Sequence, residues 1–178
     1  MKFRGAHRTM VCFCVALLLV ATGCGYHTSG HAVRLPDNIH TLCVPMFENT
    51  TQTFRVEQTL TAAVVQEFRS RTSYRIVTRD DGTADATLRG MVNYTANSPL
   101  TYDSVTGRIS SSLITVGAKV SLVSKSGKTL WDNPSYIYRE QYQVSRDVSS
   151  FFDEANPAFL RVAHEFAKSL VSNILEAY

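Results

Sequence analysis

The stretch that decides the fold is ISSSLITVGAKVSLVS, residues 109–124. Between Ile114 and Leu122 every second residue is apolar, and the residues between them are small, polar or charged. Side chains of a strand point alternately to its two faces, so this pattern predicts a long strand with one buried and one polar face. Such a strand needs antiparallel neighbours and a layer that covers its buried face.

The segments before and after this stretch alternate in the same way. Residues 86–100 precede it across a turn at residues 104–107, and residues 130–144 follow it across a hairpin turn at residues 125–128. In the first of these segments Leu88, Val92 and Tyr94 share one side. Together the three segments predict a set of antiparallel strands.

Two segments show helical periodicity instead. From about residue 53 to residue 71 an apolar stripe includes Phe68, whereas Glu67 lies off the stripe. The second helix is predicted to begin at Asn156-Pro157, an N-cap residue followed by proline, and to continue to residue 178 with Phe166 in its stripe. We expect Phe68 and Phe166 to pack against the buried face of the central strand.

Shorter strands complete the order. Residues 39–47 form a strand with Pro45 near its end, residues 48–51 break it, and residues 74–78 form a second short strand. The order β-α-β-β-β-β-α, or one strand fewer, predicts an α+β fold. In it two helices pack on one face of a four- to five-stranded, mostly antiparallel sheet.

The N-terminus has the features of a bacterial lipoprotein signal. Basic residues without acids are followed by an apolar run at residues 11–21 and then by Thr22, Gly23 and Cys24. The sequence thus predicts a signal peptide at residues 1–23, cleavage between Gly23 and Cys24, and a diacylated Cys24. A tether at residues 24–34 and a single domain at residues 35–178 follow. The alternative is an ordinary secretory signal with a chance cysteine, because Ala21 stands where a lipobox usually has leucine.

Composition narrows the classes of function. The chain has 18 Lys and Arg and 15 Asp and Glu. Three of the basic residues lie in the predicted signal, so the remaining chain is neutral overall, which argues against a nucleic-acid partner. His164-Glu165 starts like a metalloprotease helix, but Lys168 occupies the position of the second ligand. We therefore expect no catalytic site, no metal and no cofactor, and Cys43 as a core residue.

Four segments, taken in order, resemble the lipopolysaccharide-assembly lipoprotein family, LptE. They are Gly25-Tyr26-His27, LPDNIHTLCVPMFENTT (residues 35–51), LTAAVVQEF (residues 60–68) and ADATLRG (residues 84–90). The resemblance implies a non-enzymatic outer-membrane lipoprotein that plugs a β-barrel of the LptD type, assists the folding of that barrel and contacts lipopolysaccharide. It also implies two helices on a four-stranded sheet.

Other outer-membrane lipoproteins share a similar V-P-x-F-x-N strand. A curli-secretion-type lipoprotein or a penicillin-binding-protein activator is therefore the alternative, and a periplasmic enzyme on a lipid tether has no motif to support it. Gly25, rather than aspartate, after the lipidated cysteine favours the outer membrane.

Cations on the polar side of the predicted sheet are the candidate contacts for the phosphorylated head of lipopolysaccharide. If helices cover one face of the sheet, the other face collects Arg89, Lys119 and Arg139, which form one basic row if the strand register allows. The cations near the two hairpin turns are the next candidates: Arg108, Lys125 and Lys128. The alternative is that all six are solvated residues that keep an exposed face soluble.

Overall fold

The computed structural model describes residues 35–143, apart from residue 37, and residues 151–177. The predicted signal peptide, the cleavage point, Cys24 and the tether lie outside the described residues, as does Val144 at the end of a predicted strand. The elements are β1 (Thr41–Cys43), β2 (Glu48–Asn49), α2 (Val56–Arg71), β3 (Arg75–Val77), β4 (Ala86–Tyr102), β5 (Ile109–Ser124), β6 (Thr129–Gln143) and α3 (Phe151–Leu175).

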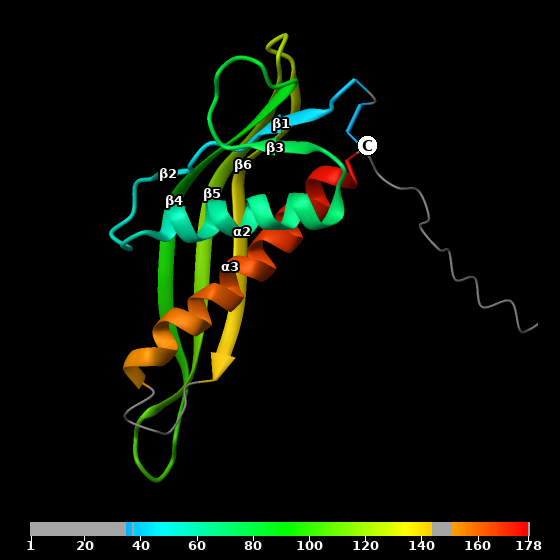
Figure 1. Cartoon of the computed structure of the whole chain (residues 1–178). Helices are drawn as coiled ribbons and strands as arrows, with labels where there is room; N and C mark the ends of the chain where they lie inside the picture. The colour runs from blue at the N-terminus through cyan, green and yellow to red at the C-terminus, as the bar shows by residue number, and fades with distance from the viewer. Residues whose placement is uncertain (1–34, 37, 144–150, 178) are drawn as a thin grey trace, which may run out of the picture. The chain divides into compact units, whose positions relative to one another are not determined.

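The strands form one six-stranded sheet with the order β3-β1-β4-β5-β6, and β2 pairs with β4 beside β1 (Figure 1). The long strands β4, β5 and β6 are antiparallel, as predicted. In contrast, β1 runs parallel to both β3 and β4, and β2 runs parallel to β4. The α+β fold class is confirmed, and the sheet is mixed because α2 carries the chain back before β3 begins, which gives a parallel crossover.

The predicted strand at residues 39–47 is divided into two short strands. Pro45 has no N–H to donate, and the chain leaves the ladder there after the Val44 amide bonds to the carbonyl of Val77 at 2.8 Å. Pairing resumes at β2, where Glu48 lies opposite Met91 and Asn49 opposite Val92. The prediction that residues 48–51 only break the strand is therefore wrong.

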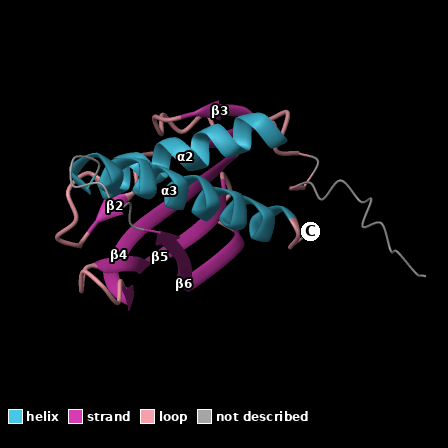
Figure 2. Cartoon of the chain, turned by 90° about the horizontal axis from the view of Figure 1, so that it is seen from below, coloured by secondary structure: helices cyan, strands magenta, loops and turns pink. Residues whose placement is uncertain are grey.

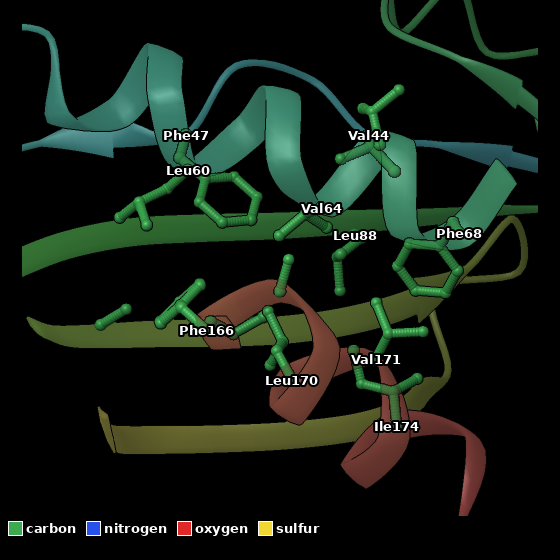
Figure 3. Close-up of a cluster of buried hydrophobic side chains, with 14 of the residues drawn as sticks. Val44, Phe47, Leu60, Val64, Phe68, Leu88, Phe166, Leu170, Val171 and Ile174 are labelled. Atoms are coloured by element: carbon green, nitrogen blue, oxygen red, sulfur yellow. The ribbon is translucent and has the colours of Figure 1, made fainter. Parts of the chain in front are cut away.

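Both helices lie on the same side of the sheet (Figure 2). Phe68 of α2 and Phe166 of α3 are fully buried, as predicted (Figure 3). Both belong to one core cluster with Val116 and Leu122. The helix α3 begins at Phe151 and not at the predicted cap Asn156, so Pro157 lies inside the helix. One proline near a helix start removes a single backbone hydrogen bond, which the rest of this 25-residue helix outweighs.

A second flank of α2 is buried where α3 packs beside it. Glu67, which the periodicity placed off the apolar stripe, is only 7% exposed. Its carboxylate lies 3.6 Å from the guanidinium of Arg71, whose Nη1 donates a 2.6 Å hydrogen bond to Ser172 Oγ on α3. The two helices are thus joined by a polar link beside the apolar core.

Candidate functional site

The side of the sheet turned away from α2 and α3 is the candidate site, and we call it the open face. On β5 the buried residues Val116, Ala118 and Val120 face the helices. The residues between them therefore point to the open face. Through the pairing register this face includes Glu48 on β2, Arg89, Met91, Tyr94, Ala96 and Ser98 on β4, Leu113, Thr115, Gly117, Lys119 and Ser121 on β5, and Asp132, Ile137, Arg139 and Gln141 on β6.

The three cations predicted for this side share the open face, but they do not form one continuous row. Arg89 lies opposite Ser121, and Lys119 lies opposite Met91. These two cations are therefore diagonal neighbours, about 7–8 Å apart. Arg139 lies opposite Thr115, which is four residues from Lys119 along β5, or about 13 Å. The register separates Arg139 from the other two.

The electrostatic surroundings of the three cations differ. The guanidinium of Arg89 lies 3.9 Å from the carboxylate of Asp80, and this exposed pair neutralises part of its charge. Lys119 and Arg139 are exposed, and no acid of the described residues lies within ion-pair distance of either. These two side chains therefore carry the charge that the open face offers to an anion.

The three turn cations lie at opposite ends of the long strands. Arg108 precedes β5, whereas Lys125 and Lys128 follow it. Since β5 has 16 residues, the two ends are about 50 Å apart. The six predicted cations thus form four separate groups: Arg89 with Lys119, Arg139, Arg108, and Lys125 with Lys128.

Asp85 anchors the end of the sheet that carries Lys125. The amides of His40 and Thr41 donate to Asp85 Oδ2 at 2.9 and 2.8 Å. These hydrogen bonds hold the pKa of Asp85 below its usual range, so its carboxylate stays charged. Its backbone carbonyl accepts a 2.7 Å bond from the amide of Lys125. The position of the β5–β6 turn that contains Lys125 is therefore set by β1 and by the residue that precedes β4.

A bulge in β4 changes the face on which Tyr94 lies. The pairing with β5 shifts between Val92 and Tyr94, so Asn93 is an extra residue and Tyr94 lies opposite Gly117. Tyr94 is 54% exposed and lies on the open face. The prediction that Tyr94 shares a side with Leu88 and Val92 is therefore wrong, because one inserted residue reverses the alternation.

Gly117 provides the space in which Tyr94 sits. A Cβ at position 117 would lie 3.0 Å from the Cβ of Tyr94 and 3.3 Å from the Oδ1 of Asn93. A residue with a side chain would force these two neighbours to move. On its other side Gly117 pairs with Ile137, which is 49% exposed. Tyr94 and Ile137 thus flank the glycine at the centre of the open face.

On the helix side of β6 a groove of about 790 Å³ lies between this strand and α3. It is lined by residues 140–143 of β6 and by Leu160, Arg161, Val162, His164 and Glu165 of α3. Next to it Tyr138 donates a 2.9 Å hydrogen bond to Glu140 Oε2, and burial together with this bond raises the pKa of Tyr138 far above its usual range. Tyr138 thus keeps its proton and acts as a donor, not as a base.

His164 and Glu165, noted in the sequence, lie beside this groove. The carboxylate of Glu165 lies 3.6 Å from the Nζ of Lys168. Within the described ranges no three His, Cys, Asp or Glu residues come together as metal ligands would. None of the described helices is long and apolar enough to cross a membrane.

A protein-family model matches most of the chain. The model describes the LptE family, with the function lipopolysaccharide assembly, and it matches residues 39–174. The matched range contains every described strand and nearly all of both helices. No protein in a search of curated sequences matches the chain.

Three solved structures are similar to this chain at low sequence identity. Protein XCC0632 from Xanthomonas campestris superposes with a TM-score of 0.53 at 15% identity, covering 81% of this chain and 88% of that one. Rare lipoprotein B from Shewanella oneidensis has a TM-score of 0.49 at 15% identity, with coverages of 75% and 94%. PelC from Paraburkholderia phytofirmans, a dodecamer, has a TM-score of 0.47 at 17% identity, with coverages of 77% and 89%. At these identities the first of the three supports the fold alone.

Proposed function

Because this chain belongs to the LptE family of lipopolysaccharide-assembly proteins, we propose that it is a non-catalytic outer-membrane lipoprotein of the lipopolysaccharide translocon. In this role it plugs a β-barrel of the LptD type, assists the assembly of that barrel and contacts lipopolysaccharide on its way to the outer leaflet. The family resemblance read from the sequence is confirmed, and the partner and the ligand contact are our proposal.

The observation that supports a ligand contact is the pair of unpartnered cations on the open face. Lipopolysaccharide carries phosphate groups, which guanidinium and ammonium groups bind through charge-assisted hydrogen bonds. Lys119 and Arg139 are exposed and have no acidic partner among the described residues. Arg89 is a weaker candidate because Asp80 competes for it. The turn cations Arg108, Lys125 and Lys128 contribute only if the ligand extends along the sheet to its ends.

The N-terminal part of the proposal concerns location. A signal peptide at residues 1–23, lipidation of Cys24 and a tether at residues 24–34 attach the domain at residues 35–178 to the membrane. The domain is then on the periplasmic side, within or beside the barrel. Gly25 after the lipidated cysteine favours the outer membrane.

Lipopolysaccharide binding tests the ligand contact. In the full chain, purified in mild detergent, changing Lys119 and Arg139 together to serine is expected to weaken binding by about tenfold or more, because two charge-assisted contacts are lost. Further change of Arg89 to serine should add less, since Asp80 already neutralises part of its charge. Added salt should weaken binding by the wild type, because exposed charges are screened. The measurement is the anisotropy of fluorescently labelled lipopolysaccharide.

A matched control removes the same charge from the helix side. Arg69 on α2 is exposed, and Lys168 on α3 is 60% exposed and pairs with Glu165. Changing both to serine should leave binding unchanged. If the folded Arg89, Lys119 and Arg139 triple variant binds as the wild type does, these cations have no role beyond solubility.

A further inference from the structure

The open face also presents an aromatic ring beside Lys119, one of the two cations that have no acidic partner among the described residues. Tyr94 lies opposite Gly117, and Lys119 is two residues further along the same strand on the same face. Tyr94 and Lys119 are therefore diagonal neighbours, which long and aromatic side chains reach across. Arg139 lies further away, on β6, where it pairs with Thr115, two residues from Gly117 in the opposite direction. Lys119 is thus the neighbouring cation of Tyr94, and β5 separates the ring from Arg139.

The backbone explains why this ring is held in solvent. The extra residue Asn93 turns Tyr94 away from the core, and Gly117 leaves room beneath it. A tyrosine that only stabilised the sheet would gain more by facing the helices with Val92, which is fully buried. The bulge instead leaves more than half of the Tyr94 surface exposed. Bulges are frequent beside functional sites, where they redirect a side chain.

The chemistry of the neighbours limits the ligand. An exposed aromatic face binds the C–H face of a sugar ring, and a cation beside it binds an anionic group on the same molecule. Two acids among the described residues share the open face: Asp132, which pairs with Ser121 on the far side of Lys119 from the ring, and Glu48 on β2, which pairs with Met91. Lys119 is therefore the cation that a phosphate group on a sugar stacked over the ring reaches.

We propose that the Tyr94 ring is a stacking platform for a sugar ring in the phosphorylated saccharide of lipopolysaccharide, with Lys119 binding a phosphate group beside that sugar and Arg139, across β5, binding a further phosphate group of the same saccharide. This proposal rests on the proposed contact with lipopolysaccharide and specifies which part of the molecule the open face recognises. The saccharide binds here, and the acyl chains do not.

Fully deacylated lipopolysaccharide, a soluble phosphorylated oligosaccharide without acyl chains, is the probe. Its binding to the full chain in mild detergent is measured by titration calorimetry. Tyr94→Ala and Tyr94→Leu are both expected to weaken binding roughly three- to tenfold, the range of aromatic stacking. Tyr94→Phe keeps the ring and should bind as the wild type does. Leucine continues to cover Gly117, so the Tyr94→Leu variant removes the ring without uncovering the strand.

The matched control is Tyr102 on the same strand. It is 62% exposed, similar to Tyr94, and it lies near the β4–β5 turn away from Lys119. Tyr102→Leu should leave binding unchanged. Removing the phosphates from the oligosaccharide should weaken binding by the wild type, and the remaining binding should still depend on Tyr94.

A direct signal of stacking comes from fluorine NMR. Incorporation of 3-fluorotyrosine labels the eight tyrosines of the chain, and the Tyr94→Phe variant identifies the Tyr94 resonance by its loss. This resonance should shift when the oligosaccharide is added, and the Tyr102 resonance should stay in place. A variant that failed to fold would lose the dispersion of all the resonances, so loss of the ring and loss of the fold are distinguishable.

Three results would overturn the assignment. The first is wild-type affinity in folded Tyr94→Ala and Tyr94→Leu variants. The second is an unchanged Tyr94 resonance at saturating oligosaccharide. The third is binding of intact lipopolysaccharide, or of phosphatidylglycerol vesicles, without binding of the deacylated oligosaccharide, which would place recognition on the acyl chains or on anionic charge alone. If intact lipopolysaccharide also fails to bind, the proposed ligand contact fails as well.

Discussion

Truncation of Phe166 to alanine is expected to lower the free energy of unfolding by about 3–5 kcal/mol, the usual cost of emptying a buried phenylalanine site. Phe166 is fully buried on α3. Its ring meets the rings of Tyr136 and Tyr138 edge to face, with centroids 5.4 and 6.2 Å apart. These contacts join α3 to β6, so the cavity would lie between a helix and the sheet that it covers.

Phe68→Ala should cost a similar amount, because Phe68 is also fully buried and joins α2 to the same core. The matched control is Leu160→Ala on α3, where the side chain is 54% exposed, and its expected cost is below about 0.5 kcal/mol. Denaturant unfolding of the purified chain measures all three. A loss below about 1 kcal/mol for Phe166→Ala would contradict the packing described.

Replacement of Cys24 by alanine is expected to abolish lipid anchoring completely. A single acyl chain binds a membrane weakly and reversibly, whereas two give stable anchoring. Without the thiol the thioether-linked diacylglycerol cannot form. The cleavage of the signal peptide that depends on this modification then does not take place. The chain should then be released or accumulate unprocessed, which fractionation and intact-mass analysis distinguish.

The control for this variant is the replacement of Cys12 and Cys14, which lie in the apolar run before the cleavage point. Their loss should leave the mature protein unchanged, because both are removed with the signal. An unmodified Cys24 in the wild type, or cleavage at another bond, would show that the segment is not a lipoprotein signal.

The long strands were predictable because alternation continues through them. The predicted central strand at residues 109–124 and the observed β5 have the same bounds. The short strands β1, β2 and β3 have only two or three residues each, too few to show a period. Their parallel pairing follows from the path of α2, which no local pattern encodes. Glu67 is buried because α3 packs against that side of α2. The periodicity of the α2 sequence alone cannot predict where another helix packs.

The candidate site was predictable in one respect and hidden in two. Alternation placed Arg89, Lys119 and Arg139 on one face, and the register confirms that placement. The register itself, which separates Arg139 from Lys119, depends on turn and bulge geometry. The bulge at Asn93 shows no distinct residue pattern, so Tyr94 appeared to face the core. One signal was available in Gly117, because a glycine inside a strand often marks a bulge or a close approach nearby.

The most direct test of the central claim is to identify what the chain binds in its own membrane. The wild-type chain, isolated from membranes in mild detergent and analysed by mass spectrometry, should bring with it a large outer-membrane β-barrel of the LptD type, in equal amounts. A homo-oligomeric ring without a barrel would contradict the account and favour a curli-secretion-type lipoprotein. Co-isolation of a peptidoglycan synthase without a barrel would contradict it equally and favour a penicillin-binding-protein activator.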